Sequence, residues 1–134
     1  MDVAEKIMEM TKKAREPYLV SIVDDDKAVR DALGNLLESV GLQVEAFASA
    51  EEFVNFSNVN HRSCLILDVQ LPRMSGLELQ HRLSNKSDSV PIIFITAHAN
   101  EKLRNRALQE GAVSFLYKPF SREDLLSTVH STLK

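Results

Sequence analysis

The stretch that decides the fold is residues 18–26, YLVSIVDDD, an apolar run that stops at three consecutive acids. Three further apolar runs stop at a residue with a charged or reactive side chain: LIL at Asp68, IIFI at Thr96 and VSFLY at Lys118. If these runs are parallel strands, their carboxyl ends lie along one edge of the sheet, where open α/β sheets bind ligands. We therefore expect acids, a hydroxyl and an ammonium group to converge on one point.

Helical patterns alternate with the apolar runs, which is typical of βαβ units. Gly41 and Gly111 stand where helix C-caps belong, Ser49 and Ser121 open capping-box patterns, and a further short strand is expected near LQVEAF at residues 42–47. Five strands and five flanking helices predict an α/β, doubly wound (flavodoxin-like), five-stranded parallel sheet in the order 2-1-3-4-5. In that order the chain reverses direction between the first and third strands, where Asp24, Asp25 and Asp68 lie.

The first sixteen residues stand outside this alternation. They place four apolar side chains on one helical face, Val3, Ile7, Met10 and Ala14, before Pro17 stops the pattern. We expect an N-terminal extension, residues 1–16, that forms an extra helix before the main domain, residues 17–134. A frayed helix without a role, and a helix that packs on the domain or pairs with a second copy, both remain open.

Length and composition fit one globular domain. The chain has 134 residues, 44% of them hydrophobic, and a formal net charge of −3 with 16 basic residues scattered among 19 acidic ones. We expect no direct nucleic-acid binding from this charge pattern, and no membrane association, because no apolar run approaches the roughly 20 residues that span a bilayer. These features predict a soluble, cytoplasmic protein. The single cysteine, Cys64, begins an apolar run and is read as a small buried hydrophobe.

The acids at the strand ends suggest a metal site. Asp26, nearest to the following helical pattern, is assigned as a helix N-cap. Asp24, Asp25 and Asp68 together require a cation, because unit charges about 4 Å apart repel by roughly 4 kcal/mol at an effective dielectric constant of 20. Carboxylates and carbonyls, with no histidine or thiolate at the strand ends, favour Mg²⁺ over zinc.

A carboxylate near Mg²⁺ and an ammonium group is suited to attack phosphorus, as in enzymes that form aspartyl phosphates. Phosphoryl transfer requires mainly positioning and neutralisation of the three equatorial oxygens. Mg²⁺ would contact one oxygen, the Lys118 ammonium another, and the Thr96 hydroxyl with backbone N–H groups the third.

Four strings carry a family resemblance: IVDDD, LILDVQLPRMSGLEL, PIIFITAHAN and GAVSFLYKPF. Over about Tyr18 to Lys134 the chain resembles the receiver domain of bacterial response regulators in two-component systems, particularly the FixJ-like subgroup. The resemblance implies that Asp68 accepts a phosphoryl group from a phosphohistidine on a cognate histidine kinase. It implies a signalling domain that is not an enzyme, because it catalyses only its own phosphorylation and autodephosphorylation.

The resemblance also implies roles for individual residues. Asp24 and Asp25 would hold Mg²⁺, with Asp68 and the Gln70 carbonyl as further ligands and Asp24 acting through water. Thr96 and Lys118 match the phosphate-sensing hydroxyl and lysine of the family, and the Lys118–Pro119 bond matches one that is usually cis.

Phosphorylation is expected to change one face of the domain. By resemblance Thr96 moves toward the phosphoryl group and Phe115 turns inward, although the apolar strand around Phe115 alone favours a plain core role. The face formed by the fourth helix of the alternation, the fifth strand and the last helix would then control homodimerisation, a partner or a DNA-binding output domain. No output domain is expected within these 134 residues. Gln70 and His98 are hypothesised to flank the path of the attacking water and to set the phosphoryl lifetime, with simple loop polarity as the alternative.

Other readings remain open. A Mg²⁺-dependent phosphatase that forms an aspartyl phosphate would require a second acid at the position where this chain has Gln70. A flavin binder would want a phosphate-cradling loop where the three acids lie, and a constitutive receiver-like adaptor would not need the full set of acids, Thr96 and Lys118. Gly34, inside the first expected helix, should cost roughly 1 kcal/mol relative to alanine, and close packing is its only expected reason.

Overall fold

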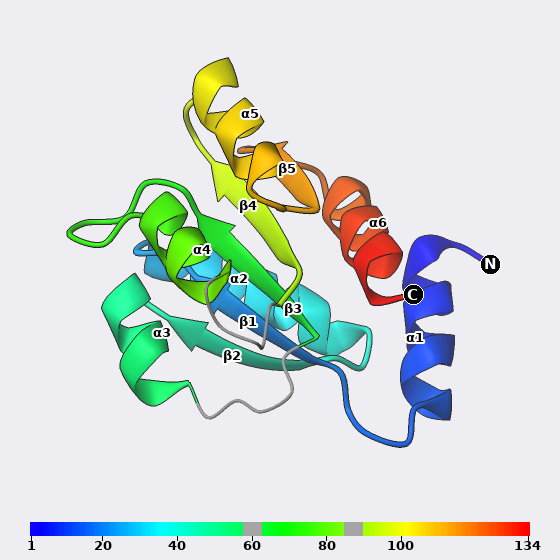
Figure 1. Cartoon of the computed structure of the whole chain (residues 1–134). Helices are drawn as coiled ribbons and strands as arrows, with labels where there is room; N and C mark the ends of the chain where they lie inside the picture. The colour runs from blue at the N-terminus through cyan, green and yellow to red at the C-terminus, as the bar shows by residue number, and fades with distance from the viewer. Residues whose placement is uncertain (58–62, 85–89) are drawn as a thin grey trace.

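A five-stranded parallel sheet forms the centre of the molecule. The computed structural model describes residues 1–57, 63–84 and 90–134. Its strands are β1 (Leu19–Val23), β2 (Gln43–Phe47), β3 (Cys64–Asp68), β4 (Ile92–Thr96) and β5 (Ser114–Tyr117). They lie in the order β2-β1-β3-β4-β5, all neighbours parallel, which confirms the predicted topology (Figure 1).

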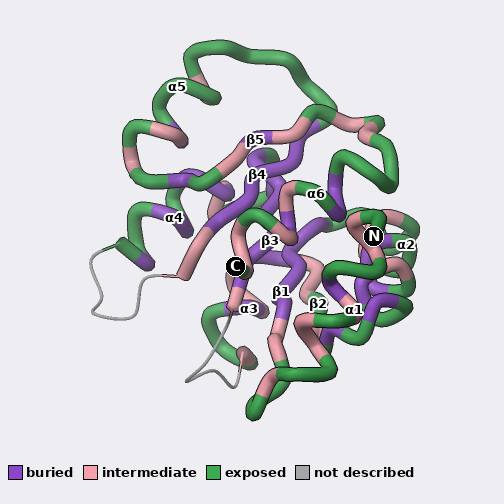
Figure 2. Tube along the Cα trace, turned by 90° about the vertical axis from the view of Figure 1, so that its right-hand side faces the viewer, coloured by how far each residue is buried: buried purple, intermediate pink, exposed green. Residues whose placement is uncertain are grey.

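Helices cover both faces of the sheet. They are α1 (Val3–Lys13), α2 (Lys27–Ser39), α3 (Ala50–Phe56), α4 (Gly76–Ser84), α5 (Glu101–Gln109) and α6 (Arg122–Leu133). Buried residues of α3, α4 and α5 pack with Leu65, Leu67 and Phe94 on one face, whereas those of α1, α2 and α6 pack with Ile66 and Ile93 on the other. Alternate residues of the central strands therefore belong to opposite cores. Figure 2 shows that these strands are buried.

The ends of the helices follow the cap residues read from the sequence. Asp26 accepts a hydrogen bond from the Ala28 N–H at 2.9 Å, and the Ser49 and Ser121 hydroxyls accept from the backbone three residues later. Gly41 and Gly111 have φ angles of 94° and 103°, a left-handed conformation that favours glycine after a helix.

The N-terminal helix α1 packs on the domain beside α6 (Figure 1). Ile7 is 0% exposed and joins the core shared with α2 and α6. The predicted apolar face was partly wrong: Ala4 and Met8 accompany Ile7 in that core, and Met10 and Ala14 do not belong to it. The face is set by where α6 and the α2–β2 turn approach α1, which the spacing within one short helix does not reveal.

Gly34 lies buried in α2, but the expected close packing is absent. A Cβ built at Gly34 would meet its nearest neighbour, Val44 Cγ1, at 3.8 Å, an ordinary van der Waals distance. The structure therefore gives no steric reason for glycine at this position. Within the described residues, no helix has the length and apolar character needed to cross a membrane.

Candidate functional site

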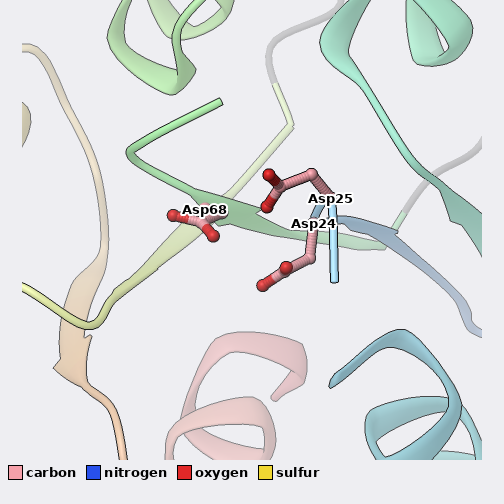
Figure 3. A group of neighbouring side chains, drawn as sticks. All are labelled: Asp24, Asp25 and Asp68. Carbon is pink, nitrogen blue, oxygen red and sulfur yellow. The ribbon is translucent and has the colours of Figure 1, made fainter. Parts of the chain in front are cut away.

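Three carboxylates gather where β1 and β3 end (Figure 3). Asp24 and Asp25 follow β1, and Asp68 is the last residue of β3, the neighbouring strand. Each offers an oxygen, and these oxygens lie within 4.8 Å of one another. Asp24 is 0% exposed and Asp68 is 6% exposed, whereas Asp25 faces solvent. The predicted convergence of the acids at the switch point is therefore present.

Lys118 joins the two buried acids. Its Nζ lies 2.7 Å from Asp24 Oδ2 and 3.1 Å from Asp68 Oδ2. The residue follows β5, and its backbone N–H donates to the Thr96 carbonyl at 2.7 Å, which extends the pairing with β4. The Lys118–Pro119 peptide bond is cis, as the resemblance implied. Side chains from three strand ends thus form one charged group.

The electrostatics of this group leave negative charge in excess. Burial raises the pKa of Asp68, the nearby Asp24 charge adds to the rise, and the Gln70 N–H and Lys118 oppose it. For Lys118, burial by itself lowers the pKa, but the hydrogen bond to Asp24 and the charge of Asp68 outweigh it and leave the pKa raised. One ammonium therefore faces three carboxyl groups, and the cluster favours a further cation.

Backbone contacts fix the orientation of both buried carboxylates. The Asp26 N–H donates to Asp24 Oδ1 at 2.9 Å, and the Gln70 N–H donates to Asp68 Oδ1 at 2.9 Å. Arg30, on the first turn of α2, donates to the Asp24 carbonyl at 2.8 Å. Sequence reasoning missed Arg30, and its only signal was a basic residue one turn after the N-cap.

The remaining predicted residues lie around the cluster. Thr96, 2% exposed, ends β4 beside Asp68, and its hydroxyl accepts from the His98 N–H at 3.1 Å. Gln70 and His98 are exposed loop residues. Phe115, 9% exposed, points into the core, with its ring centroid 6.0 Å from that of Phe94 and 5.5 Å from that of Tyr117.

Gly76 packs directly on the backbone of the Asp68 segment. A Cβ at Gly76 would overlap the Asp68 carbonyl oxygen and lie 3.0 Å from Val69 Cα. The Gly76 N–H also donates to the Val69 carbonyl at 3.0 Å. The close approach of the start of α4 to the Asp68 backbone could not be predicted from the sequence.

An apolar groove of about 480 Å³ runs beside Lys118. Its walls come from α2, from the segment after β4 and from the segment between β5 and α6, and are formed by Ala28, Val29, Ala32, Leu33, Ala97, Pro119 and Phe120. Lys118 itself lines the groove, so the groove adjoins the acidic cluster.

The donor set of the cluster fits a hard divalent cation. It contains three carboxylates, and no histidine or cysteine belongs to it among the described residues. Oxygen donors of this kind suit Mg²⁺, which keeps several waters and needs only one or two protein carboxylates. Asp24, Asp25 and Asp68 are the residues that could hold such an ion.

Comparison with known proteins places this arrangement in a family. The sequence model described as the response regulator receiver domain matches residues 20–130. Response regulator protein TodT of Pseudomonas putida is 45% identical over 116 residues, which cover 87% of this chain and 51% of TodT. Nodulation protein W of Bradyrhizobium diazoefficiens is 46% identical over 117 residues, 87% of this chain and 52% of that protein. The chain spans about half the length of these curated relatives.

Solved structures of response regulators and receiver domains have the same fold as this chain. The response regulator StyR matches with a TM-score of 0.78 and 43% identity, over 88% of this chain and 60% of that one. A receiver domain protein of Methanospirillum hungatei matches with a TM-score of 0.82 and 29% identity, over 88% and 94% of the two chains. With the strand order, the acidic edge and Lys118 all in their predicted places, the chain belongs to the receiver domain family of two-component response regulators.

Proposed function

We propose that Asp68 accepts a phosphoryl group from the phosphohistidine of a histidine kinase and that the domain transmits this event to a partner. The observation that carries the proposal is the position of Lys118, whose ammonium lies between the buried carboxylates of Asp24 and Asp68. An acid held at a strand end beside a fixed positive charge is suited to nucleophilic attack on phosphorus.

In the proposed reaction an Asp68 oxygen forms a bond to phosphorus while the bond between phosphorus and the imidazole nitrogen breaks. The imidazole nitrogen keeps the electron pair and binds a proton from water. Lys118 and the Thr96 hydroxyl contact the oxygens of the transferred group, and Asp24, Asp25, Asp68 and the Gln70 carbonyl would hold Mg²⁺. The chemistry that Mg²⁺ supplies when bound is neutralisation of charge on the acids and the phosphoryl oxygens.

The kinase would dock in the apolar groove beside Lys118. Its walls are largely apolar and come from α2, from the segment after β4 and from the segment before α6, so a helix with an apolar face complements them. A helix seated there would bring a phosphohistidine on its surface to the open side of the acidic cluster.

The output would pass through the face formed by α5, β5 and α6, which corresponds to the face named from the sequence. Phosphorylation adds charge beside Thr96 and Lys118, and movement of Thr96 would alter the packing of Phe115 against Phe94 and Tyr117. Transcriptional regulatory protein FixJ of Azorhizobium caulinodans is 38% identical over 118 residues, 88% of this chain and 56% of FixJ. By analogy the partner is a second copy of the domain or a DNA-binding output domain.

Gln70 and His98 are proposed to set the phosphoryl lifetime, since both are exposed next to residues of the cluster. Autodephosphorylation of Gln70→Ala and His98→Ala proteins tests this role. A changed lifetime in either variant supports it, and unchanged lifetimes in both would remove it.

The central test is incubation with acetyl phosphate and Mg²⁺, followed by intact-mass measurement. We expect one phosphate adduct on the wild type, no adduct on Asp68→Asn, and a normal adduct on Asp26→Asn, because Asp26 caps α2. A wild type that stays unmodified at saturating Mg²⁺ would instead support a constitutive adaptor. Rapid release of inorganic phosphate with many turnovers would support the phosphatase alternative.

A further inference from the structure

The loop between β3 and α4 carries Gln70 and presses Gly76 against the phosphoacceptor segment, and a side chain from another helix holds its middle. Glu51, on the first turn of α3, accepts a hydrogen bond from the Met74 N–H through Oε2 at 3.0 Å. This contact joins residues 23 positions apart in the sequence. It is a direct link between α3 and the loop that follows Asp68.

The loop needs such an anchor because its backbone is not in a relaxed conformation. Arg73 has a φ angle of 63°, in the left-handed region that non-glycine residues rarely adopt. Immediately after it, the Met74 N–H points to Glu51, and the Met74 side chain packs on the core beneath α4. The Glu51 hydrogen bond therefore acts on the residue that follows the left-handed Arg73 backbone.

Glu51 is held as an anion at this position. The Met74 N–H lowers the pKa of the carboxyl group most, and the Glu51 N–H adds to this. Burial opposes the shift, and the charges of Arg73 and Arg82 make smaller contributions that lower the pKa further. The second oxygen, Oε1, is buried and has no hydrogen-bond partner within the described part of the chain. The Met74 N–H therefore donates to a charged acceptor, and a hydrogen bond to a charged group is stronger than one between neutral groups.

We propose that Glu51 is a positioning residue for the phosphorylation of Asp68. By holding Met74 it fixes the loop whose Gln70 N–H orients Asp68 and whose Gln70 carbonyl would contribute to the metal site. The inference rests on the proposed function of Asp68, and it adds a residue from α3 that the acidic cluster does not contain.

The test compares three variants with the wild type in the full chain. Glu51→Ala removes the acceptor, Glu51→Gln keeps an acceptor oxygen without the charge, and Glu52→Ala removes the adjacent acid, which makes no hydrogen bond to the loop. For each protein we would measure the acetyl phosphate reaction rate, the Mg²⁺ dissociation constant by calorimetry, the melting temperature, and amide exchange at Met74.

We expect Glu51→Ala to expose the Met74 amide to exchange, to weaken Mg²⁺ binding, and to slow phosphorylation on the order of tenfold, because small displacements of reacting groups have large effects on rate. Glu51→Gln should stay within about twofold of the wild type, and Glu52→Ala should match it. Rescue by glutamine separates positioning from a loss of fold stability, which the melting temperature records.

Two results would overturn the inference. One is a Glu51→Ala protein with wild-type rate and Mg²⁺ affinity whatever its melting temperature, and the other is a Glu51→Gln protein as impaired as Glu51→Ala. Failure of the proposed function looks different, because the wild type and Glu52→Ala would then also lack the adduct. Mg²⁺ affinity and Met74 exchange would still report on Glu51 in that case.

Discussion

Replacing Lys118 with alanine should destabilise the metal-free protein strongly. The ammonium lies 2.7 Å from Asp24 and 3.1 Å from Asp68, and its side chain is only 19% exposed. Without it, the two acids face each other within a cluster whose oxygens lie at most 4.8 Å apart. At that distance and an effective dielectric constant of 20, two unit charges repel by about 3.5 kcal/mol. We expect the free energy of unfolding to fall by about 3 kcal/mol at neutral pH, in the range for a buried pair that loses one partner.

The loss of stability in Lys118→Ala should depend on pH and on Mg²⁺. Burial already raises the pKa of Asp68, and removal of Lys118, which opposes that rise, raises it further. The folded protein then binds a proton that the unfolded chain does not, so stability falls as pH rises above the ordinary aspartate pKa and is regained on acidification. Mg²⁺ should also restore stability, because a divalent cation replaces the missing positive charge.

Urea unfolding followed by far-ultraviolet circular dichroism, with EDTA and then with excess Mg²⁺, measures both effects. Lys27→Ala is the matched control, because the Lys27 Nζ pairs with Asp31 at 2.6 Å while the Lys27 side chain is 77% exposed. This substitution should lower the free energy of unfolding by less than about 0.5 kcal/mol. One contrary result is a free energy of unfolding that, in EDTA, falls no more in Lys118→Ala than in Lys27→Ala. The other is a Lys118→Ala protein that binds Mg²⁺ much more weakly than the wild type. Either result would mean that Lys118 does not neutralise the acids as described.

Further predictions concern packing. Gly34→Ala should stabilise the protein by about 0.5–1 kcal/mol, since the new methyl group meets only Val44 at 3.8 Å. Gly76→Ala should instead lower both the melting temperature and the acetyl phosphate reaction rate, because it displaces the Asp68 backbone. Equal effects of the two substitutions would contradict this assignment. Ile7→Ala should cost about 2–5 kcal/mol in urea unfolding, because Ile7 is 0% exposed, and Met1→Ala, at 70% exposed, should cost less than about 0.5 kcal/mol. A negligible cost for Ile7→Ala would mean that α1 does not stay packed in solution.

The sequence predicted what depends on local pattern and strand direction. Apolar runs of about five residues between helical patterns leave few topologies, and the order chosen from these is the one that the structure has. The strand-end positions of Asp24, Asp68 and Lys118 then placed them on one edge without knowledge of any side-chain contact. Caps at Asp26 and Gly41 were readable because each acts within one turn of its own helix.

Contacts between segments far apart in the chain could not be predicted from the sequence. The Glu51 hydrogen bond to Met74 depends on how α3 sits beside the β3–α4 loop, and glutamate on a first helical turn is also common for its charge alone. The overlap at Gly76 depends on the approach of α4 to Asp68, while Gly34, which looked like a packing glycine, meets nothing closely. Glycine in a sequence therefore marks a position of special interest but not the reason for it.

Lys118 and Thr96 differ in how far their present contacts must change in the proposed switch. Lys118 already touches Asp68 at 3.1 Å, so it can follow a phosphoryl group on that residue with little displacement. The Thr96 hydroxyl is instead bound to the His98 N–H at 3.1 Å and must exchange this contact to reach the same group. Because a ligand shifts an equilibrium only by its different interactions with the two states, we expect the exchange of the Thr96 contact to contribute to the proposed switch. That loop leads into α5, so we expect phosphorylation to displace the β4–α5 connection if Thr96 moves as proposed.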